Sequence, residues 1–333
     1  MGLAQITAAM YNNGNHLSLE KFPVVGFHKS YSANDLITDS AAGATAFSCG
    51  VKTYNNAIGL SKDSLACKTI LEEAEERGLA TGLVATSTIV HATPAAFIAH
   101  QKLRVLYENI ASDMLNVDVD LLIGGGKKYF DRRENDQRDL YQELKDKGYR
   151  VYDYSTRPLE EIIPDKKRNL VYFTADNLPL PVSAGRTYLP IASNLATNFL
   201  AKRSENGFFL MIEGSQIDWA GHANEGELLV SEMLDFDKAI NKVLDFARKR
   251  DDTLVIVTAD HETGGMSINQ GSVMGELKYG FTSNAHTGTL IPVFAYGPGA
   301  ALFSGIYENT AIHDKIRKAF GFNTPILPKA NSN

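Results

Sequence analysis

The chain has 333 residues, 44% hydrophobic and 22% charged, so it can bury a sizeable core as one large or two ordinary domains. Its net charge of −6 disfavours a broad nucleic-acid-binding face, which needs clustered Lys and Arg, so we expect no nucleic-acid partner. No run of about 18 apolar residues would span a membrane, and the first residues lack the charged and apolar regions of a secretory signal.

Apolar runs typical of buried strands alternate with helical patterns along the chain. The predicted order is helix Lys68–Arg77, strand Thr81–Thr86, strand Asp120–Ile123, helix Leu140–Lys147, strand Leu170–Thr174, helix Ile191–Arg203, strand Phe208–Ile212, helix Gly226–Arg250, strand Leu254–Thr258, strand Pro292–Tyr296 and helix Ala311–Phe320. This alternation predicts an α/β fold with a large, mostly parallel central sheet and helices on both faces.

The alternation of strands and helices runs along the chain without a sign of a domain boundary. No internal repeat, low-complexity linker or composition break occurs, so residues 1–333 are expected to form a single domain. The segment Tyr129–Lys167 is richly charged and is predicted to lie outside the core. Cys49 and Cys67 are too few for a disulfide framework and too far apart for a CxxC motif, so they indicate no compartment.

A hydroxyl precedes small helix-forming residues in the segment Thr38–Ala46. Free backbone N–H groups and the dipole at a helix start favour a phosphate, so Ser40 is a candidate nucleophile. An ordinary N-cap explains the local sequence more simply, since Ser and Asp are preferred caps. A serine hydroxyl also needs activation, which a coordinated metal would supply.

Acids and histidines follow several predicted strands, where ligand groups gather at the carboxyl edge of a parallel sheet. Asp218 and His222 are spaced i, i+4, which places a carboxylate and an imidazole side by side on a helical turn. Asp260 and His261 follow a buried strand, and His286 could add an imidazole from a loop. Simpler alternatives are a solvated helix start, a turn with a capping Asp and an unremarkable loop histidine.

The segment Asp39–Asn55, DSAAGATAFSCGVKTYN, resembles the nucleophile segment of alkaline phosphatases. Further similar segments extend over nearly the whole chain and are His91–Ala96, Leu122–Gly126, Glu213–His222, Val257–His261, His286–Gly288 and Tyr296–Pro298. The resemblance implies an alkaline phosphatase-like catalytic domain that hydrolyses small phosphate monoesters. It also implies a homodimer that is periplasmic or secreted.

The resemblance implies a binuclear zinc site. One zinc would be held by Asp218, His222 and His286, and the other by Asp260 and His261. Ser40 would contact the second zinc and attack a phosphomonoester in line, forming a phosphoserine that water then hydrolyses.

A phosphate clamp and a magnesium site are also implied. Arg104 matches the family arginine that holds phosphate, a task suited to a planar fork of donors, and Asp39 would orient it. Its local alternative is a surface charge. Thr93 and Glu213 match oxygen ligands of a third site, for magnesium.

Two residues near the implied magnesium site differ from some relatives. His91, counted here among the metal ligands, stands where some members have Asp, and Trp219 stands where some have Lys. Magnesium prefers oxygen ligands, so we expect weaker magnesium binding at this site.

The start of the sequence departs from the family pattern. The family normally has a strand and Gly-Asp-Gly immediately before the segment matching Met1–Ala4, and its Asp ligates metals. We expect that the sequence is a truncated form rather than a natural variant with an impaired metal site, because an unpaired buried sheet edge is costly.

Three other functions share parts of this pattern. A related phosphodiesterase could share the fold and metals, although Arg104 favours a terminal phosphate. A sulfatase would have Cys or Ser followed by x-Pro-x-Arg at position 40, which is absent. A metal-impaired phosphate-binding protein is the third alternative, and metal content would distinguish it from an enzyme.

Overall fold

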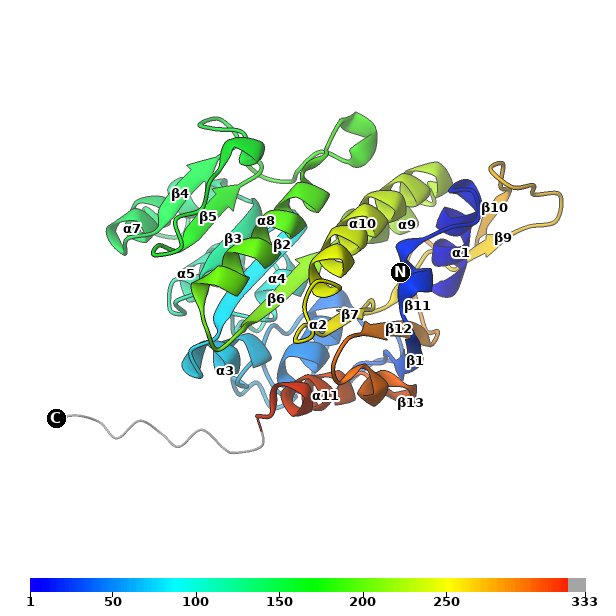
Figure 1. Ribbon diagram of the computed structural model, residues 1–333, viewed down its shortest axis with the longest axis horizontal. Helices are drawn as coiled ribbons and strands as arrows, with labels where there is room; N and C mark the ends of the chain where they lie inside the picture. The colour runs from blue at the N-terminus through cyan, green and yellow to red at the C-terminus, as the bar shows by residue number, and fades with distance from the viewer. Residues whose placement is uncertain (323–333) are drawn as a thin grey trace.

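The computed structural model describes residues 1–322 (Figure 1). Its helices are α1 (Leu3–Asn12), α2 (Ser40–Cys49), α3 (Ile70–Glu76), α4 (Ala92–Ala95), α5 (Tyr107–Met114), α6 (Lys128–Asp131), α7 (Leu140–Asp146), α8 (Tyr188–Arg203), α9 (Gln216–Ala223), α10 (Gly226–Ala247) and α11 (Ala311–Phe320). Its strands are β1 (Val24–Lys29), β2 (Ala80–Thr88), β3 (Leu121–Gly125), β4 (Arg150–Asp153), β5 (Leu170–Phe173), β6 (Phe208–Glu213), β7 (Val255–Val257), β8 (Glu262–Thr263), β9 (Met266–Ile268), β10 (Tyr279–Phe281), β11 (His286–Thr287), β12 (Ile291–Tyr296) and β13 (Gly305–Glu308).

Two main sheets form the centre of the molecule. The first has five strands in the order β4-β5-β3-β2-β6, all parallel. The second has four strands in the order β13-β1-β12-β7, in which β12 is antiparallel to both neighbours. The predicted α/β class with a parallel central sheet is therefore confirmed. The difference is that the sheet is divided between β6 and β7.

Helices cover both faces of the five-stranded sheet because its strands alternate apolar side chains between two cores. Val84 of β2 belongs to a core with residues of α8, whereas its neighbour Leu83 belongs to a core with residues of α2, α3 and α4. Figure 1 shows α8 and α10 on the near side of the strands. Within residues 1–322, no helix is both long enough and apolar enough to cross a membrane.

The predicted elements are all present, strands within two residues and helices within three at each end. The expectation for Tyr129–Lys167 was wrong. This segment contains α7 and the edge strand β4, and its Phe130, Leu140 and Leu144 are buried in the main core. Apart from the buried Asp153, its charged residues are exposed or half-buried, and their number concealed the apolar residues that point inward.

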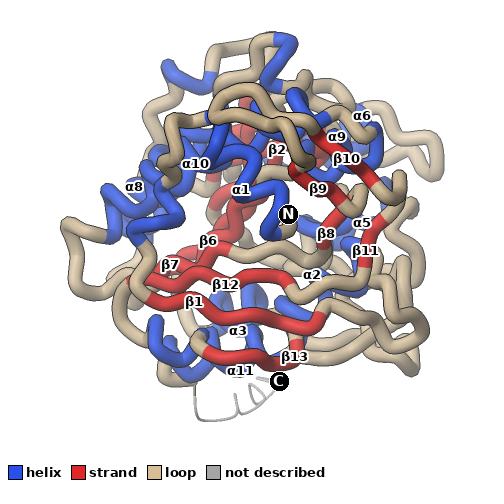
Figure 2. The backbone as a smooth tube through the Cα atoms, turned by 90° about the vertical axis from the view of Figure 1, so that its right-hand side faces the viewer, coloured by secondary structure: helices blue, strands red, loops and turns tan. Residues whose placement is uncertain are grey.

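Strands β6 and β7 are neighbouring edge strands of the two sheets (Figure 2), and residues along them line a slot between the sheets. It forms part of a cavity of about 780 Å³ lined by residues 204–215 and 252–261. Phe236 and Ile240 of α10 line it too, as do Phe47 and Phe97. Within the described residues, each strand is paired along its other edge only, β6 with β2 and β7 with β12. The cavity continues to Ser40 at the carboxyl ends of these strands.

Helix α2 begins beside the end of β7 and is held at both ends. Asp39 is the N-cap and accepts a hydrogen bond from the Ala42 N–H, and Gly50 ends the helix with a φ of 71°. A side chain at Gly43 would lie 2.8 Å from Asp260 Cβ, so glycine permits the close approach of α2 to the β7 end. A disulfide joins Cys49 to Cys67 and ties the end of α2 to the segment before α3. Sequence spacing alone did not predict that pairing.

Candidate active site

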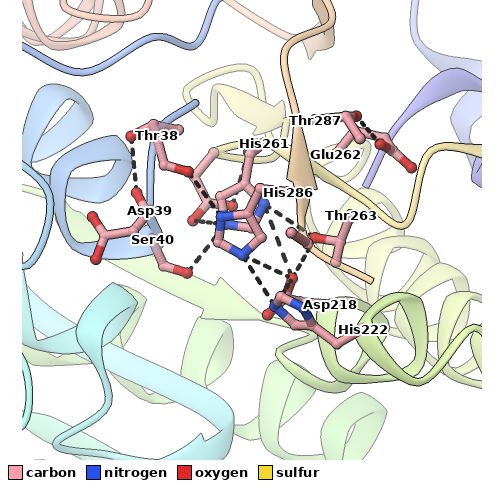
Figure 3. A network of polar contacts seen from close by, with 12 residues as sticks. Thr38, Asp39, Ser40, Asp218, His222, His261, Glu262, Thr263, His286 and Thr287 are labelled. Carbon is pink, nitrogen blue, oxygen red and sulfur yellow. Dashed lines mark hydrogen bonds and ion pairs between the residues drawn. The ribbon is translucent and has the colours of Figure 1, made fainter. Parts of the chain in front are cut away.

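The Ser40 hydroxyl lies where α2 meets the end of the second sheet. Ser40 is the first residue of α2 and is only 5% exposed. Its Oγ lies 3.1 Å from Nε2 of His261, which follows β7 (Figure 3). The free N–H groups at the start of α2 are available to an anion bound in front of Ser40.

A carboxylate and two imidazoles converge next to this hydroxyl. Asp218 and His222 lie four residues apart on α9, and His286 comes from β11. One ligand atom from each lies within 4.8 Å of the others. The Nε2 atoms of His222 and His286 are 3.1 Å apart, and each is about as close to Asp218 Oδ1, at 3.5 and 3.6 Å.

The hydrogen bonds of these imidazoles identify the atoms that are free to bind a metal. His222 Nδ1 lies 2.7 Å from the Asn284 carbonyl, and His286 Nδ1 lies 2.8 Å from the Thr38 carbonyl. A carbonyl only accepts, so each Nδ1 carries a proton and Nε2 is the ring nitrogen left to bind a metal. Two lone pairs beside a carboxylate form a donor set that suits zinc.

A second acidic and imidazole pair lies between Ser40 and this cluster. Asp260 Oδ2 is 3.2 Å from His261 Nε2, and the His261 ring stacks on the His286 ring with centroids 3.5 Å apart. Burial lowers the pKa of His261, but the Asp260 carboxylate outweighs it and raises that pKa above its usual value. Burial raises the pKa of Asp260, but His261 outweighs it and lowers that pKa. The two sets are therefore adjacent.

Arg104 extends from the segment between α4 and α5 toward the start of α2. Its Nη1 lies 3.1 Å from Asp39 Oδ2. Asp39 also accepts hydrogen bonds from the backbone N–H groups of Ala42 and Asn56, each at 3.0 Å. These bonds hold the carboxylate in place beside the guanidinium.

The residues expected to bind magnesium gather at the ends of β2 and β6. Glu213 ends β6, and its partly buried carboxylate accepts a hydrogen bond from Ser215 Oγ at 2.6 Å. Burial raises the pKa of Glu213 to about 7, and a hydrogen bond with Thr93 opposes that shift. His91 begins α4 and packs edge-on against Trp219, with ring centroids 5.9 Å apart.

His91 differs from the other site histidines in its hydrogen bonds. Burial, together with the charge of Arg104, lowers the pKa of His91 to about 4, so the ring is neutral near pH 7. Its Nδ1 is buried without a hydrogen-bond partner. An unpartnered ring nitrogen near a buried carboxylate and a threonine hydroxyl also fits a cation.

The structure therefore brings together all the residues predicted for the site, although their chemical roles stay predictions. Sequence reasoning missed the groups that orient them. These are the carbonyls of Thr38 and Asn284 and the side chains of Glu262, Thr263 and Thr287. Glu262 and Thr263 directly follow His261 in sequence, which is the one signal that could have drawn attention to them.

Comparisons with known proteins agree with this geometry. Residues 1–279 and 273–322 match the family described as Alkaline phosphatase. The chain is 36% identical to "Alkaline phosphatase 3" of Bacillus subtilis (strain 168), covering 88% of this chain and 79% of that protein. It is 30% identical to "Alkaline phosphatase" of Escherichia coli (strain K12), covering 96% of this chain and 84% of that protein.

Solved structures resemble this one over almost its whole length. The alkaline phosphatase from the Antarctic bacterium TAB5 is 44% identical, with a TM-score of 0.90 over 97% of this chain and 96% of that one. A histidine-to-glutamate mutant of the TAB5 enzyme, described as having Mg bound in the M3 site, is 43% identical with a TM-score of 0.89 over the same shares.

Proposed function

The chain belongs to the alkaline phosphatase family and hydrolyses phosphate monoesters, and we propose that it does so through a covalent phosphoserine at Ser40. The observation that carries this proposal is the position of Ser40 Oγ, at a helix start and 3.1 Å from His261 Nε2. The Asp260 and His261 set lies next to that hydroxyl, and the Asp218, His222 and His286 set lies directly beyond it.

The protein groups around Ser40 divide the work of the reaction. Ser40 Oγ attacks phosphorus in line, the bond to the leaving alkoxide breaks, and water later cleaves the phosphoserine. Arg104, oriented by Asp39, holds two equatorial oxygens of the phosphate. The N–H groups at the start of α2 add to the stabilisation of the developing negative charge.

Two zinc ions and one magnesium ion are the proposed cofactors. Asp218, His222 and His286 would hold one zinc, Asp260 and His261 with Ser40 the other, and Thr93, Glu213 and His91 the magnesium. When bound, these ions act as Lewis acids that lower the pKa of coordinated hydroxyls and neutralise charge on the phosphate. The mutant described with Mg in the M3 site supports a magnesium position in this family.

Trapping of the intermediate tests the nucleophile. The metal-loaded protein is mixed with a phosphomonoester, quenched in acid and digested, and the phosphate should be found by mass analysis on the peptide that contains Ser40. Ser40→Ala should show no burst of product and no labelled peptide. Label on a different residue would overturn the assignment.

An extra strand in the slot between β6 and β7 is the second part of the proposal. The strand pairings leave the facing edges of β6 and β7 without a partner strand among residues 1–322, and the cavity lies along both. Such a strand would satisfy backbone groups along both facing edges and would end beside Glu213 and Asp260. This supports the expectation that the family's first strand and its metal-binding Asp belong here.

The test compares this chain with one extended by that strand. Zinc content and phosphatase turnover should both rise in the extended chain. Equal metal content and turnover in the two proteins would argue against a strand in the slot. An extension in which the added Asp is replaced by Asn separates sheet completion from metal ligation.

We propose an extracytoplasmic location and a homodimer, the periplasm or the secreted state being implied by the family resemblance. The Cys49–Cys67 disulfide supports the location, because disulfides persist mainly in oxidising compartments. Fractionation of the native host and mass measurement of the native protein in solution test these two proposals separately.

A further inference from the structure

Two very short strands carry the site residues His286 and Thr263. Strand β8 (Glu262–Thr263) pairs with β11 (His286–Thr287) in an antiparallel ladder whose register places His286 opposite Thr263 and Thr287 opposite Glu262. Successive side chains on a strand point to opposite faces. His286 and Thr263 therefore share the face toward Asp218 and His222, and Glu262 and Thr287 share the other face (Figure 3).

The register of this ladder matters more than its length suggests. Pairing that slips by one residue would turn His286 away from Asp218 and His222. A ladder of two residues has little backbone pairing to prevent that slip. Something other than the backbone must fix which residues stand opposite each other.

We propose that Glu262 is a positioning residue that locks this register and so places His286 in the metal cluster. Its carboxylate is 5% exposed and accepts a hydrogen bond from the Thr287 hydroxyl directly across the ladder. Its oxygens also accept from the backbone N–H groups of Gly265 and Met266, at 3.1 and 3.2 Å, in the turn that follows β8. Ladder and turn are thus joined through one side chain.

Helix α1 holds Glu262 from the other side. Gln5 Nε2 lies 3.3 Å from Glu262 Oε1 and donates to the Thr263 carbonyl at 2.8 Å. Gln5 is completely buried. A side chain at Gly2 would lie 2.4 Å from Glu262 Cγ, so glycine is needed where α1 begins. These contacts leave the carboxylate a single orientation.

The same ladder also reaches Asp218. Thr263 Oγ1 donates to Asp218 Oδ1 and lies 3.2 Å from His261 Nδ1. Locking the ladder therefore sets ligands of both proposed zinc positions, with the larger effect on His286. This inference rests on the proposed metal site, and it assigns no chemical step to Glu262.

The test measures zinc affinity of the metal-free protein by calorimetry. Thr287→Val removes the hydroxyl that meets Glu262, and Thr287→Ser keeps it. We expect Thr287→Val and Glu262→Gln to weaken one of the two zinc-binding steps, the one that involves His286. The loss of affinity should be about 10- to 100-fold, the range for groups that orient metal ligands. Thr287→Ser should stay within about threefold of the natural protein, because its hydroxyl restores the contact.

Glu73→Gln is the matched control. Glu73 is 6% exposed and pairs with Arg317 away from the site, so this change should lower the melting temperature without altering zinc affinity. Hydrogen exchange of residues 260–290 should accelerate in Thr287→Val but not in Glu73→Gln.

Three outcomes are decisive. If Thr287→Val binds zinc as tightly as the natural protein, the role of Glu262 is overturned. The same holds if Glu73→Gln loses as much zinc affinity as Thr287→Val. Absence of zinc binding in the natural protein would instead overturn the proposed metal site. If Glu262→Gln does not fold, the Val and Ser variants of Thr287 still decide the question.

Discussion

Two clusters in the same site differ in how well their hydrogen bonds and protonation states already suit the binding of a cation. In the Asp218, His222 and His286 cluster, each imidazole Nδ1 meets a backbone carbonyl and each Nε2 faces inward. In the Glu213 and His91 cluster, the carboxyl pKa is raised to about 7 and His91 Nδ1 has no hydrogen-bond partner. The first set is preorganised for a cation, whereas the second must lose a proton as it binds one.

This difference predicts that the two clusters bind cations with different affinity and different pH dependence. Outer hydrogen bonds fix the tautomer and direction of a ligand before the metal arrives, so little free energy is lost on binding. A buried carboxyl that is partly protonated near neutral pH makes cation binding depend on pH. We therefore expect tight binding in the first cluster and weaker, pH-dependent binding in the second.

The largest expected contrast comes from removing one imidazole from each cluster. His286→Ala should lose zinc and reduce turnover by more than about 100-fold, beyond the range for groups that only orient a ligand. His91→Ala should keep its zinc and lose less than about tenfold. Elemental analysis and steady-state turnover of both variants make the measurement. Equal losses would show that the two clusters do not differ as described.

Stability against pH gives the next largest effect. In the metal-free protein the folded pKa of Glu213 is about 7 and its ordinary value is 4.5, so the folded state binds more protons between these values. Stability should therefore fall as the pH rises from 4.5 to 7, by roughly 3 kcal/mol from this group. Glu213→Gln should lack that fall, and denaturant unfolding at several pH values measures it.

Other groups titrate in the same experiment and must be subtracted. The raised pKa of His261 also removes stability as the pH rises. The lowered pKa of Asp260 removes stability only as the pH falls below its ordinary 3.8. The difference between the natural protein and Glu213→Gln isolates one carboxyl. A flat difference between pH 4.5 and 7 would contradict the raised pKa of Glu213.

Arg104 tests whether phosphate and metal binding are separable at this end of the site. Arg104→Ala should weaken inhibition by phosphate about 10- to 100-fold, because a charge-assisted contact contributes about 1.5–3 kcal/mol. Zinc content should not change. Arg104→Lys keeps the charge without the planar fork and should recover only part of the loss. Unchanged inhibition in Arg104→Ala would place Arg104 outside the phosphate site.

The sequence predicted those parts of the molecule whose signal is local. Each buried strand is an apolar run, and the predicted ligands Asp260 and His261 come shortly after one, so strand ends could be matched to a site. Arg104 and Glu213 came from family resemblance, because an isolated arginine or glutamate has no distinctive pattern. Their approach to Asp39 and Ser215 required the folded chain.

The remaining features of the site could not be predicted from the sequence. They depend on backbone groups, which every residue carries, or on strands too short to give a sequence pattern. The carbonyls of Thr38 and Asn284 orient two imidazoles, yet any residue has a carbonyl. The β8 and β11 strands have two residues each, below the length at which alternation is visible. The Cys49–Cys67 pair needed the turn of the chain between α2 and α3. These features belong to tertiary structure.

The smallest expected effect concerns His91 and Trp219, which pack edge-on beside Glu213 with ring centroids 5.9 Å apart. His91→Asp would offer magnesium a carboxylate oxygen in place of a neutral ring with an unpartnered Nδ1. Trp219→Lys would add a positive charge near the phosphate and offset the added negative one. The double variant should tighten both magnesium and phosphate by about tenfold, roughly one charge-assisted contact each. Product would then leave more slowly, which lowers turnover if release is the slow step.

Each single variant serves as the control for this double change. His91→Asp alone should tighten magnesium and weaken phosphate, because two carboxylates then face the anion. Trp219→Lys alone should do the reverse. If Trp219 only packs against His91, the double variant will bind magnesium and phosphate as the natural protein does, and only its melting temperature will fall. Calorimetric titration with magnesium and with phosphate, on protein whose zinc content is intact, separates these results because packing and charge act on different measurements.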